Sequence, residues 1–320
     1  MRGPIQLRIA SSVTLYGEAP QESAASVYLP DTPPLAALVC LAGGNMNRGY
    51  YDLRAEQDRS FSFAAQMTAR GFAVVTIDHL GLGQSTRPQD GYALTPDVIA
   101  AGNAHATAEI LGSMRRGALA GVPAMPGLRS LGVGHSMGAM LTVLQQARAR
   151  QHDGIALLGF STRGLPRFVP DDVRALAGDV AAVRARLVEF ARRMFVQPYP
   201  RIRSSGGDNA GLYGSSEADP RGVAALKAAT DCLLPVPAFL SMIPGNVAPE
   251  AARIDVPVYL GIGERDMVGR PEDVPTAFAA SPKVTLEVLP ATGHSHFLFA
   301  ARERLFEGIA AWAKAIAHPP

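Results

Sequence analysis

The sequence GHSMG places Ser136 between two glycines, Gly134 and Gly138. The serine follows the apolar run SLGVG and precedes the helix-like stretch MGAMLTVLQQARA. A serine on a sharp turn between a strand and a helix presents its hydroxyl as a nucleophile, and flanking glycines leave room for that turn. We therefore predict that Ser136 is a nucleophile. The alternative is a glycine-rich turn without a catalytic role.

A serine hydroxyl is a weak nucleophile unless a base lies beside it. Two of the seven histidines, His294 and His296, lie in the sequence PATGHSHFLF, directly after the last apolar run of the chain. His294 is nearer to the end of the predicted strand, so we predict that it is the base. We expect His296 to be an ordinary exposed histidine or a neighbour of the site residues.

An imidazole base needs a carboxylate that fixes its tautomer and stabilises its charged form. Asp266 lies in GERDM, just after the apolar run VPVYLGIG. Glu264 is the alternative, but it comes earlier in the same turn. The chain order Ser, Asp, His favours Asp266. The stretch GFSTRGLP contains no carboxylate, which removes another position for the acid.

Acyl transfer also needs hydrogen-bond donors for the oxyanion of the tetrahedral intermediate. The N–H of Met137 is predicted to start a helix next to Ser136 and to supply one donor. The second donor is predicted in LVCLAGGNMN, where glycine lets the backbone approach a substrate closely. Gly44 is the first candidate and Asn45 the second. A plain turn between a strand and a helix would also favour Gly and Asn.

The elements that must position these residues follow from the apolar pattern. Near-continuous apolar runs predict strands that are buried on both faces, as in a parallel sheet covered by helices. These runs cover residues 35–44, 71–79, 130–136, 154–161, 256–263 and 283–290. The first thirty residues predict an antiparallel hairpin. Helices are expected over 95–117, with Thr95 as N-cap and Pro96 in the first turn, and over 301–318. The alternation of strands and helices indicates an α/β fold.

Residues 163–250 interrupt this alternation, because they contain no convincing strand. An amphipathic helix is predicted over 179–195. We interpret 163–250 as a helical cap over the site, with residues 1–162 and 251–320 as the core. Four polar or small residues of the cap lie in a glycine- and serine-rich stretch and are expected in a surface loop rather than in a gate: Arg203, Ser204, Gly206 and Asp208.

Composition excludes several classes of protein. The net charge is only +2 and the basic residues are dispersed, so nucleic acid binding is not indicated. The two cysteines, Cys40 and Cys232, do not form a disulfide framework, and no signal peptide or membrane span is recognised, so a cytoplasmic protein is expected. No His, Asp and Glu cluster has ligand spacing, and GLGQS is an incomplete dinucleotide loop, so neither a metal nor a cofactor is predicted.

Four stretches together resemble the α/β-hydrolase superfamily: GHSMG at the nucleophile, GERDMV at the acid, TGHSH at the base, and DHLGLGQSTRP at 78–88. The resemblance covers 35–162 and 254–320 and implies an α/β-hydrolase fold, in which helices flank a mostly parallel central sheet. Members with dehalogenase- or epoxide-hydrolase-like chemistry carry an aspartate nucleophile, whereas this chain has Ser136. Ala42 stands where many members have histidine, and 163–250 resembles no subfamily.

The resemblance and the site residues imply a serine hydrolase that cleaves a carboxylic ester through an acyl-enzyme. A small hydrophobic ester or lactone is the expected partner, because the cap is rich in apolar residues, some of which must pack its own core: Phe168, Phe190, Phe195, Leu233, Leu234, Phe239 and Leu240. A thioesterase, an acyltransferase or a carbon–carbon bond hydrolase would use the same triad. A ligand-binding receptor on the hydrolase scaffold is the alternative outside enzymes. The sequence leaves a homodimer open.

Overall fold

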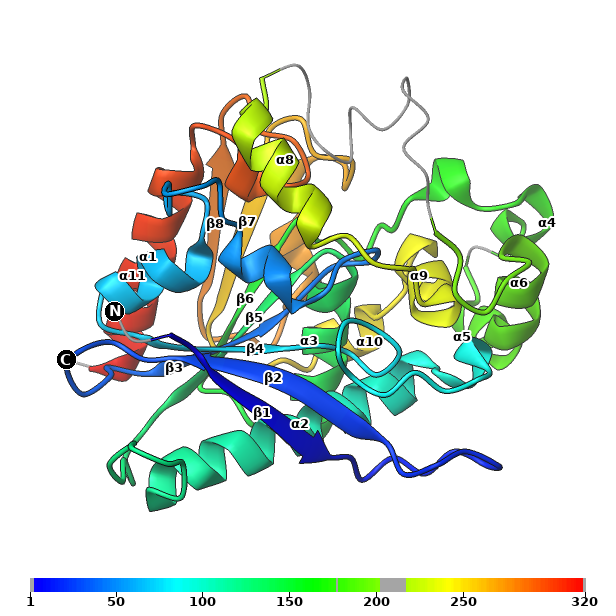
Figure 1. The fold of residues 1–320 in the computed structure, drawn as a ribbon. Helices are drawn as coiled ribbons and strands as arrows, with labels where there is room; N and C mark the ends of the chain where they lie inside the picture. Colours follow the sequence, from blue (N-terminus) through cyan, green and yellow to red (C-terminus); the bar gives the residue numbers. More distant parts are fainter. Residues whose placement is uncertain (1–2, 177, 202–216, 319–320) are drawn as a thin grey trace.

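The computed structural model describes residues 3–176, 178–201 and 217–318. Its centre is one eight-stranded sheet in the order β1-β2-β4-β3-β5-β6-β7-β8 (Figure 1). The strands are β1 Ile5–Ala10, β2 Glu22–Tyr28, β3 Ala37–Leu41, β4 Ala73–Ile77, β5 Ser130–His135, β6 Gly154–Leu158, β7 Val258–Gly263 and β8 Val284–Leu289. All neighbours from β4 to β8 are parallel, whereas β1 pairs with β2, and β2 with β4, in antiparallel fashion.

The apolar runs predicted as strands are strands of this sheet. Every residue of β3, β4, β5, β6 and β7 is buried, as expected for strands covered on both faces. The edge strand β1 alternates between half-buried and exposed residues instead. The mostly parallel α/β-hydrolase sheet and its N-terminal hairpin are therefore confirmed.

Helices cover both faces of the sheet (Figure 1). The helices α2 (Pro96–Arg116) and α3 (Met137–Ala149) pack in one apolar core, and α1 (Phe63–Ala69) and α11 (Arg302–Ala317) pack in the other. The side chain of Thr95 accepts a hydrogen bond from Val98 N and begins α2 as predicted, while Gly117, at φ 69°, ends it.

Residues 163–250, here called the helical segment, lie between β6 and β7. Their described part contains short helices and no strand of the sheet. The helices are α4 Asp171–Arg174, α5 Val180–Ala185, α6 Leu187–Met194, α8 Pro220–Ala228, α9 Pro235–Met242 and α10 Ala248–Ala251. Arg203, Ser204, Gly206 and Asp208 lie outside the described residues.

The single helix predicted over 179–195 is wrong, because the chain breaks at Arg186 into α5 and α6. The two halves have different partners. Arg184 in α5 forms an ion pair with Glu250 (2.8 Å), whereas Phe190 in α6 packs against Phe239 of α9, with ring centroids 6.0 Å apart. The two halves therefore contact different helices, α5 contacting α10 and α6 contacting α9, and the amphipathic pattern does not reveal this.

The helical segment leaves and rejoins the core at one place. Gly245 N donates to Thr162 O (2.7 Å), and Leu165 N donates to Met242 O (2.8 Å). The side-chain amide of Asn246 adds a hydrogen bond to Ser161 O (3.3 Å). The two ends of the segment therefore form a closed neck beside the ends of β6 and β7.

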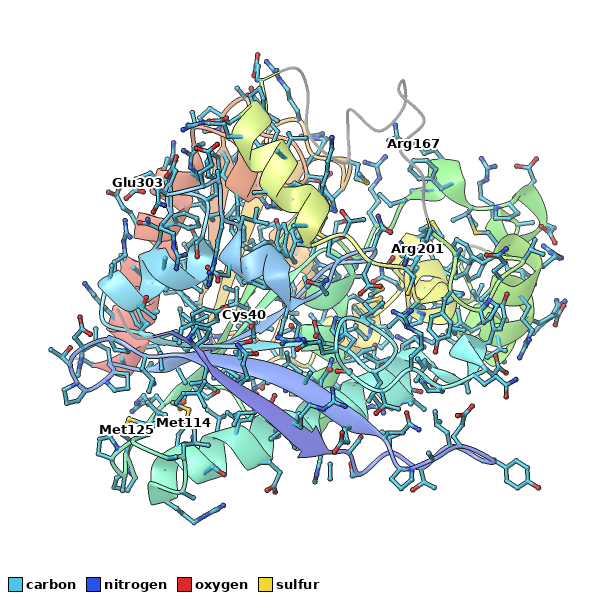
Figure 2. All side chains as sticks on the ribbon, in the orientation of Figure 1. Cys40, Met114, Met125, Arg167, Arg201 and Glu303 are labelled. Carbon is cyan, nitrogen blue, oxygen red and sulfur yellow. The ribbon has the colours of Figure 1, made fainter. Side chains whose placement is uncertain are left out.

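Both cysteines are buried and free. Cys40 lies on β3 in the middle of the sheet, while Arg167 and Arg201 mark the side of the molecule that carries the helical segment (Figure 2). None of the described helices combines the length and apolarity that a bilayer crossing requires.

Candidate active site

Ser136 lies on a strained turn between β5 and α3. Its backbone has φ 55° and ψ −122°, a conformation that L-residues rarely adopt. A Cβ on Gly138 would overlap the carbonyl oxygen of Leu41, and one on Gly134 would overlap the backbone of Ala139. Neither glycine position has room for a side chain, which agrees with the role predicted for both.

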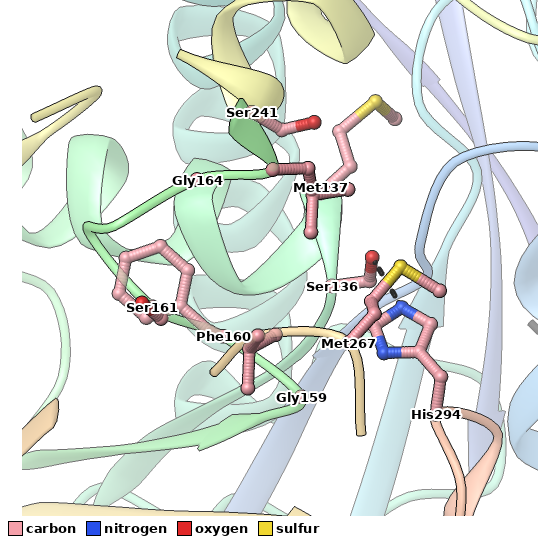
Figure 3. Close-up of a pocket in the computed structure, with 11 residues that line it drawn as sticks. Ser136, Met137, Gly159, Phe160, Ser161, Gly164, Ser241, Met267 and His294 are labelled. Carbon is pink, nitrogen blue, oxygen red and sulfur yellow. Dashed lines mark hydrogen bonds between the residues drawn. The ribbon is translucent and has the colours of Figure 1, made fainter. Parts of the chain in front are cut away.

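The structure brings Ser136, Asp266 and His294 together from three connections. His294 Nε2 lies 2.8 Å from Ser136 Oγ (Figure 3), and His294 Nδ1 lies 2.8 Å from Asp266 Oδ1. Asp266 follows β7 and His294 follows β8, so both come from the carboxyl ends of parallel strands that lie beyond β5 and β6 in the sheet. This is the arrangement of a nucleophile, a base and an orienting acid.

Burial and charge set the state of the acid. The side chain of Asp266 is fully buried and that of His294 is 5% exposed. Burial by itself raises the pKa of Asp266, but the adjacent His294 and His296 outweigh this effect and hold the pKa well below its usual range. Asp266 is therefore ionised at neutral pH and can stabilise a positive charge on an imidazole.

His296 is not exposed, and the structure agrees with the second of its two expected placements, that of a neighbour of the site residues. It is fully buried, and its Nε2 lies 3.2 Å from Asp266 Oδ2. Glu264, the alternative acid, accepts a hydrogen bond from Ala291 N (2.8 Å) and holds the loop that precedes His294. Within the described ranges, no group of three or more His, Cys, Asp or Glu side chains could hold a metal ion.

Three further residues enclose the base and the acid, and sequence reasoning missed them. His135 Nε2 lies 2.9 Å from His294 O, and the His135 ring stacks on Tyr50 with centroids 4.5 Å apart. Burial lowers the pKa of His135 well below its usual range, so the ring is neutral. A Cβ on Gly159, at φ 59°, would lie 3.0 Å from His294 Nδ1 and 3.1 Å from Asp266 Oδ2. The position of Gly159 at the end of a predicted strand was the available signal.

The predicted oxyanion donors lie beside Ser136. Met137 is the first residue of α3, so its N–H has no acceptor within the helix. A Cβ on Gly44 would lie 3.9 Å from Met137 Cβ and 2.9 Å from Leu233 Cδ1, which places Gly44 between the start of α3 and the helical segment. Asn45 has φ 66°, and its carbonyl accepts a hydrogen bond from Asp231 N (2.9 Å).

A small cavity of about 30 Å³ adjoins Ser136 and His294 (Figure 3), with room for no more than a few water molecules. Its other lining residues are mostly apolar or small: Met137, Gly159, Phe160, Ser161, Gly164, Leu165, Ser241, Met267 and Val268. Three of them, Gly164, Leu165 and Ser241, belong to the helical segment. Sequence reasoning assigned no role to any residue of this lining except Met137.

The apolar residues predicted to line a pocket do not line this cavity. Phe190 and Phe239 pack against each other, and Leu233, Leu234 and Leu240 are buried within the apolar core. Phe168 is 45% exposed, and Phe195 packs against the same core. The other expectation, that these residues pack the core of the helical segment itself, describes most of them.

The parallel sheet with a serine on the turn after β5 defines the class of this protein. The chain belongs to the alpha/beta hydrolase family, whose family model matches residues 38–307. The sequence has no match among the curated proteins with which it was compared.

Solved structures share the fold along their whole length. A thermostable carboxyl esterase from Bacillus coagulans is 19% identical, with a TM-score of 0.65 over 99% of this chain and 100% of that one. A thermophilic esterase from Thermogutta terrifontis is 15% identical, with a TM-score of 0.58 over 98% and 100% of the two chains. Proline iminopeptidase from Mycobacterium smegmatis is 18% identical, with a TM-score of 0.56 over 97% and 99%.

Proposed function

We propose that this hydrolase is a serine esterase that cleaves small hydrophobic carboxylic esters or lactones. The observation that carries the proposal is the continuous chain of contacts from Ser136 Oγ through His294 to Asp266, with both distances at 2.8 Å. The burial of His294 and Asp266 keeps water away from the hydrogen bond between them, so that the carboxylate holds the ring in position for proton transfer with Ser136. The similarity to two structures described as esterases supports the choice of an ester.

In the first half of the reaction, Ser136 Oγ attacks the ester carbonyl carbon while its proton passes to His294 Nε2. Asp266 accepts the Nδ1–H hydrogen bond and stabilises the imidazolium. The N–H groups of Met137 and of Gly44, with Asn45 as the alternative to Gly44, stabilise the negative oxygen of the tetrahedral intermediate. The intermediate collapses when His294 protonates the leaving alkoxide, which departs as an alcohol.

In the second half, the acyl group is bound to Ser136 as an ester. His294 removes a proton from water, and the resulting oxygen nucleophile attacks the acyl carbon. The same backbone donors stabilise the second tetrahedral intermediate. Its collapse returns the proton from His294 to Ser136 and releases the carboxylic acid.

The cavity supports a hydrophobic acyl group of limited size. Phe160, Leu165, Met267 and Val268 offer it apolar contacts, while its volume of about 30 Å³ leaves little room for a long chain. Leu165 and Ser241 come from the helical segment, which supports the interpretation of residues 163–250 as a cap over a core formed by 1–162 and 251–320. Methionine side chains adapt readily, so Met137 and Met267 can enlarge the space for a bound acyl group.

The test compares p-nitrophenyl esters of increasing acyl length on the wild type and on Ser136→Ala. Removal of a triad serine lowers kcat by roughly four to six orders of magnitude in enzymes of this kind. The matched control is Ser281→Ala, because Ser281 is bound to Val256 O (2.9 Å) at the opposite end of β7 and should not affect turnover. Rates are expected to be highest for short acyl chains.

Equal activity of the wild type and Ser136→Ala would overturn the proposal. So would the absence of labelling of Ser136 by a fluorophosphonate, a reagent that phosphonylates activated serines. Rapid labelling combined with slow ester hydrolysis would instead direct the search to thioesters, to acyl acceptors other than water, or to a ligand that is held rather than turned over.

A further inference from the structure

We propose that His296 is a positioning residue for this site: its Nε2–H donates to Asp266 Oδ2 and thereby keeps Asp266 Oδ1 on His294. This inference rests on the proposed serine esterase mechanism. It assigns a role in the reaction to a histidine that lies outside the triad.

The geometry around Asp266 supports this role for His296. The carboxylate lies between two histidines, with Oδ1 2.8 Å from His294 Nδ1 and Oδ2 3.2 Å from His296 Nε2. The side chains of Asp266 and His296 are both fully buried. Water therefore cannot replace either contact without entering the core.

Asp266 Oδ2 and the His296 ring depend on each other for a polar contact. Among the described residues, Asp266 Oδ2 and both ring nitrogens of His296 lack a well-aligned hydrogen bond, and His296 Nε2 approaches Asp266 Oδ2 to 3.2 Å. A buried carboxylate oxygen without a donor carries a large desolvation cost. The Nε2–H of His296 therefore supplies a donor that Asp266 Oδ2 otherwise lacks.

His135 and Tyr50, which also face Asp266 and His296, are uncharged. Burial lowers the pKa of His135 well below its usual range, and burial followed by the charge of Asp266 raises the pKa of Tyr50 well above it. Neither group therefore places a positive charge beside the carboxylate. The rings of His135 and His296 meet at 88° with centroids 5.7 Å apart, which holds the orientation of His296.

The consequence concerns the rotation and the charge of the carboxylate. With Oδ2 bound, Asp266 cannot turn about its side-chain bond, and His294 keeps the alignment that its reaction with Ser136 requires. Without the donor, the full negative charge is directed at His294, which then holds a proton more tightly. Catalysis would slow and would require a higher pH.

The test compares His296→Leu with His296→Gln. Leucine removes the donor, whereas the amide of glutamine can reach the position of the Nε2–H. We expect His296→Leu to lower kcat roughly 10- to 100-fold, the usual effect of one hydrogen bond to a charged group, with little change in KM. The acid limb of the profile of kcat/KM against pH should move upward by about half a unit, since one unit corresponds to a tenfold change in proton affinity. His296→Gln should restore most of both properties.

The matched control is His152→Leu together with His152→Gln. His152 is also a buried histidine, but it is bound to Ser130 Oγ (2.8 Å) at the opposite ends of the strands. Its variants can lower thermal stability but should leave the pH profile unchanged. Thermal unfolding of all four variants shows which of them are folded.

A folded His296→Leu protein with an unchanged kcat and pH profile would overturn the inference. Equal losses in His296→Leu and His296→Gln would also overturn it, because a role in packing alone would not distinguish the two. The low-field proton resonance of the His294–Asp266 hydrogen bond provides a readout that needs no turnover. It should be retained in His296→Gln and be lost or shifted in His296→Leu. Should the wild type fail to hydrolyse any ester, this resonance still tests the inference while the proposed function fails.

Discussion

The turn that carries Ser136 and the helical segment are held in different ways. The turn is fixed by the backbone, because Ser136 N donates to Leu158 O (2.8 Å) and a Cβ on Gly138 would overlap the neighbouring strand. The helical segment is tied to the loop after β4 mainly by side chains. Asp231 accepts hydrogen bonds from Gly83 N (2.7 Å) and Arg87 (3.1 Å).

Other contacts of the helical segment are of the same kind. The hydroxyl of Tyr199 donates to Pro88 O (2.8 Å), that of Tyr92 donates to Phe195 O, and Arg192 forms an ion pair with Asp90 (2.6 Å). The ion pair between Arg192 and Asp90 is exposed, and exposed side-chain contacts are individually weak and can open separately. On the proposed function, the core carries out the chemistry, whereas the helical segment selects the substrate.

The largest expected effect tests the core. Asp266→Asn should lower kcat by about four orders of magnitude for every ester alike, because the amide no longer fixes the productive tautomer of the base. Steady-state rates on short and longer acyl esters measure this. Glu264→Gln is the matched control, since Glu264 lies in the same turn and binds Ala291 N rather than His294. A loss of activity that depends on acyl length would contradict the proposal that the core residues carry out the reaction while the helical segment selects the acyl group.

A smaller effect, on substrate preference rather than on the reaction itself, is expected when a residue of the helical segment is changed. Leu165→Ala removes a side chain of the helical segment from the cavity lining and should raise the ratio of long-chain to short-chain kcat/KM about tenfold, the usual range for one or two methylene groups in an apolar pocket. Phe168→Ala is the control, because Phe168 lies in the same turn but is 45% exposed. An unchanged preference in Leu165→Ala would show that the segment does not select the acyl group.

The smallest effect concerns the attachment of the segment. Asp231→Ala removes the contacts to Gly83 and Arg87 and should speed hydrogen exchange of the amides in α9 a few-fold, as expected for a locally loosened element. Hydrogen exchange read by mass spectrometry measures this. Asp255→Ala removes an ion pair with Arg150 on the core instead and should leave α9 unchanged. Equal exchange in both variants would mean that packing, and not Asp231, holds the segment.

Much of the core could be predicted from local pattern. Five of its strands are buried along their whole length, so continuous apolar runs reveal them without knowledge of their neighbours. Ser136 and Asp266 come directly or shortly after two of these strands, β5 and β7, and His294 follows the half-buried β8; parallel strands bring their carboxyl ends to one edge. The spacing in the sequence was therefore enough to bring the three together.

The rest depends on contacts between distant parts of the chain. The sequence places His296 two residues after His294 but does not reveal that it faces Asp266, and it places Gly159 near the end of a predicted strand but does not reveal that it lies against His294. The amphipathic pattern continues through Arg186, although the chain breaks there. Phe160 was missed because it was assigned to the predicted strand 154–161, whereas β6 ends at Leu158, and Met267 was missed because it lies in a turn, where apolar residues have no periodicity.

The closed neck of the helical segment has a consequence for how this protein can change. Since Gly245 N is bound to Thr162 O and Leu165 N to Met242 O, the two ends of the insertion are tied to each other close to where the chain leaves β6. An insertion of different length and sequence can be grafted at this junction while the sheet stays in register. On the proposed role of the helical segment as a cap, the region between β6 and β7 is the part of the chain in which sequence changes would alter specificity while the catalytic edge stays in place.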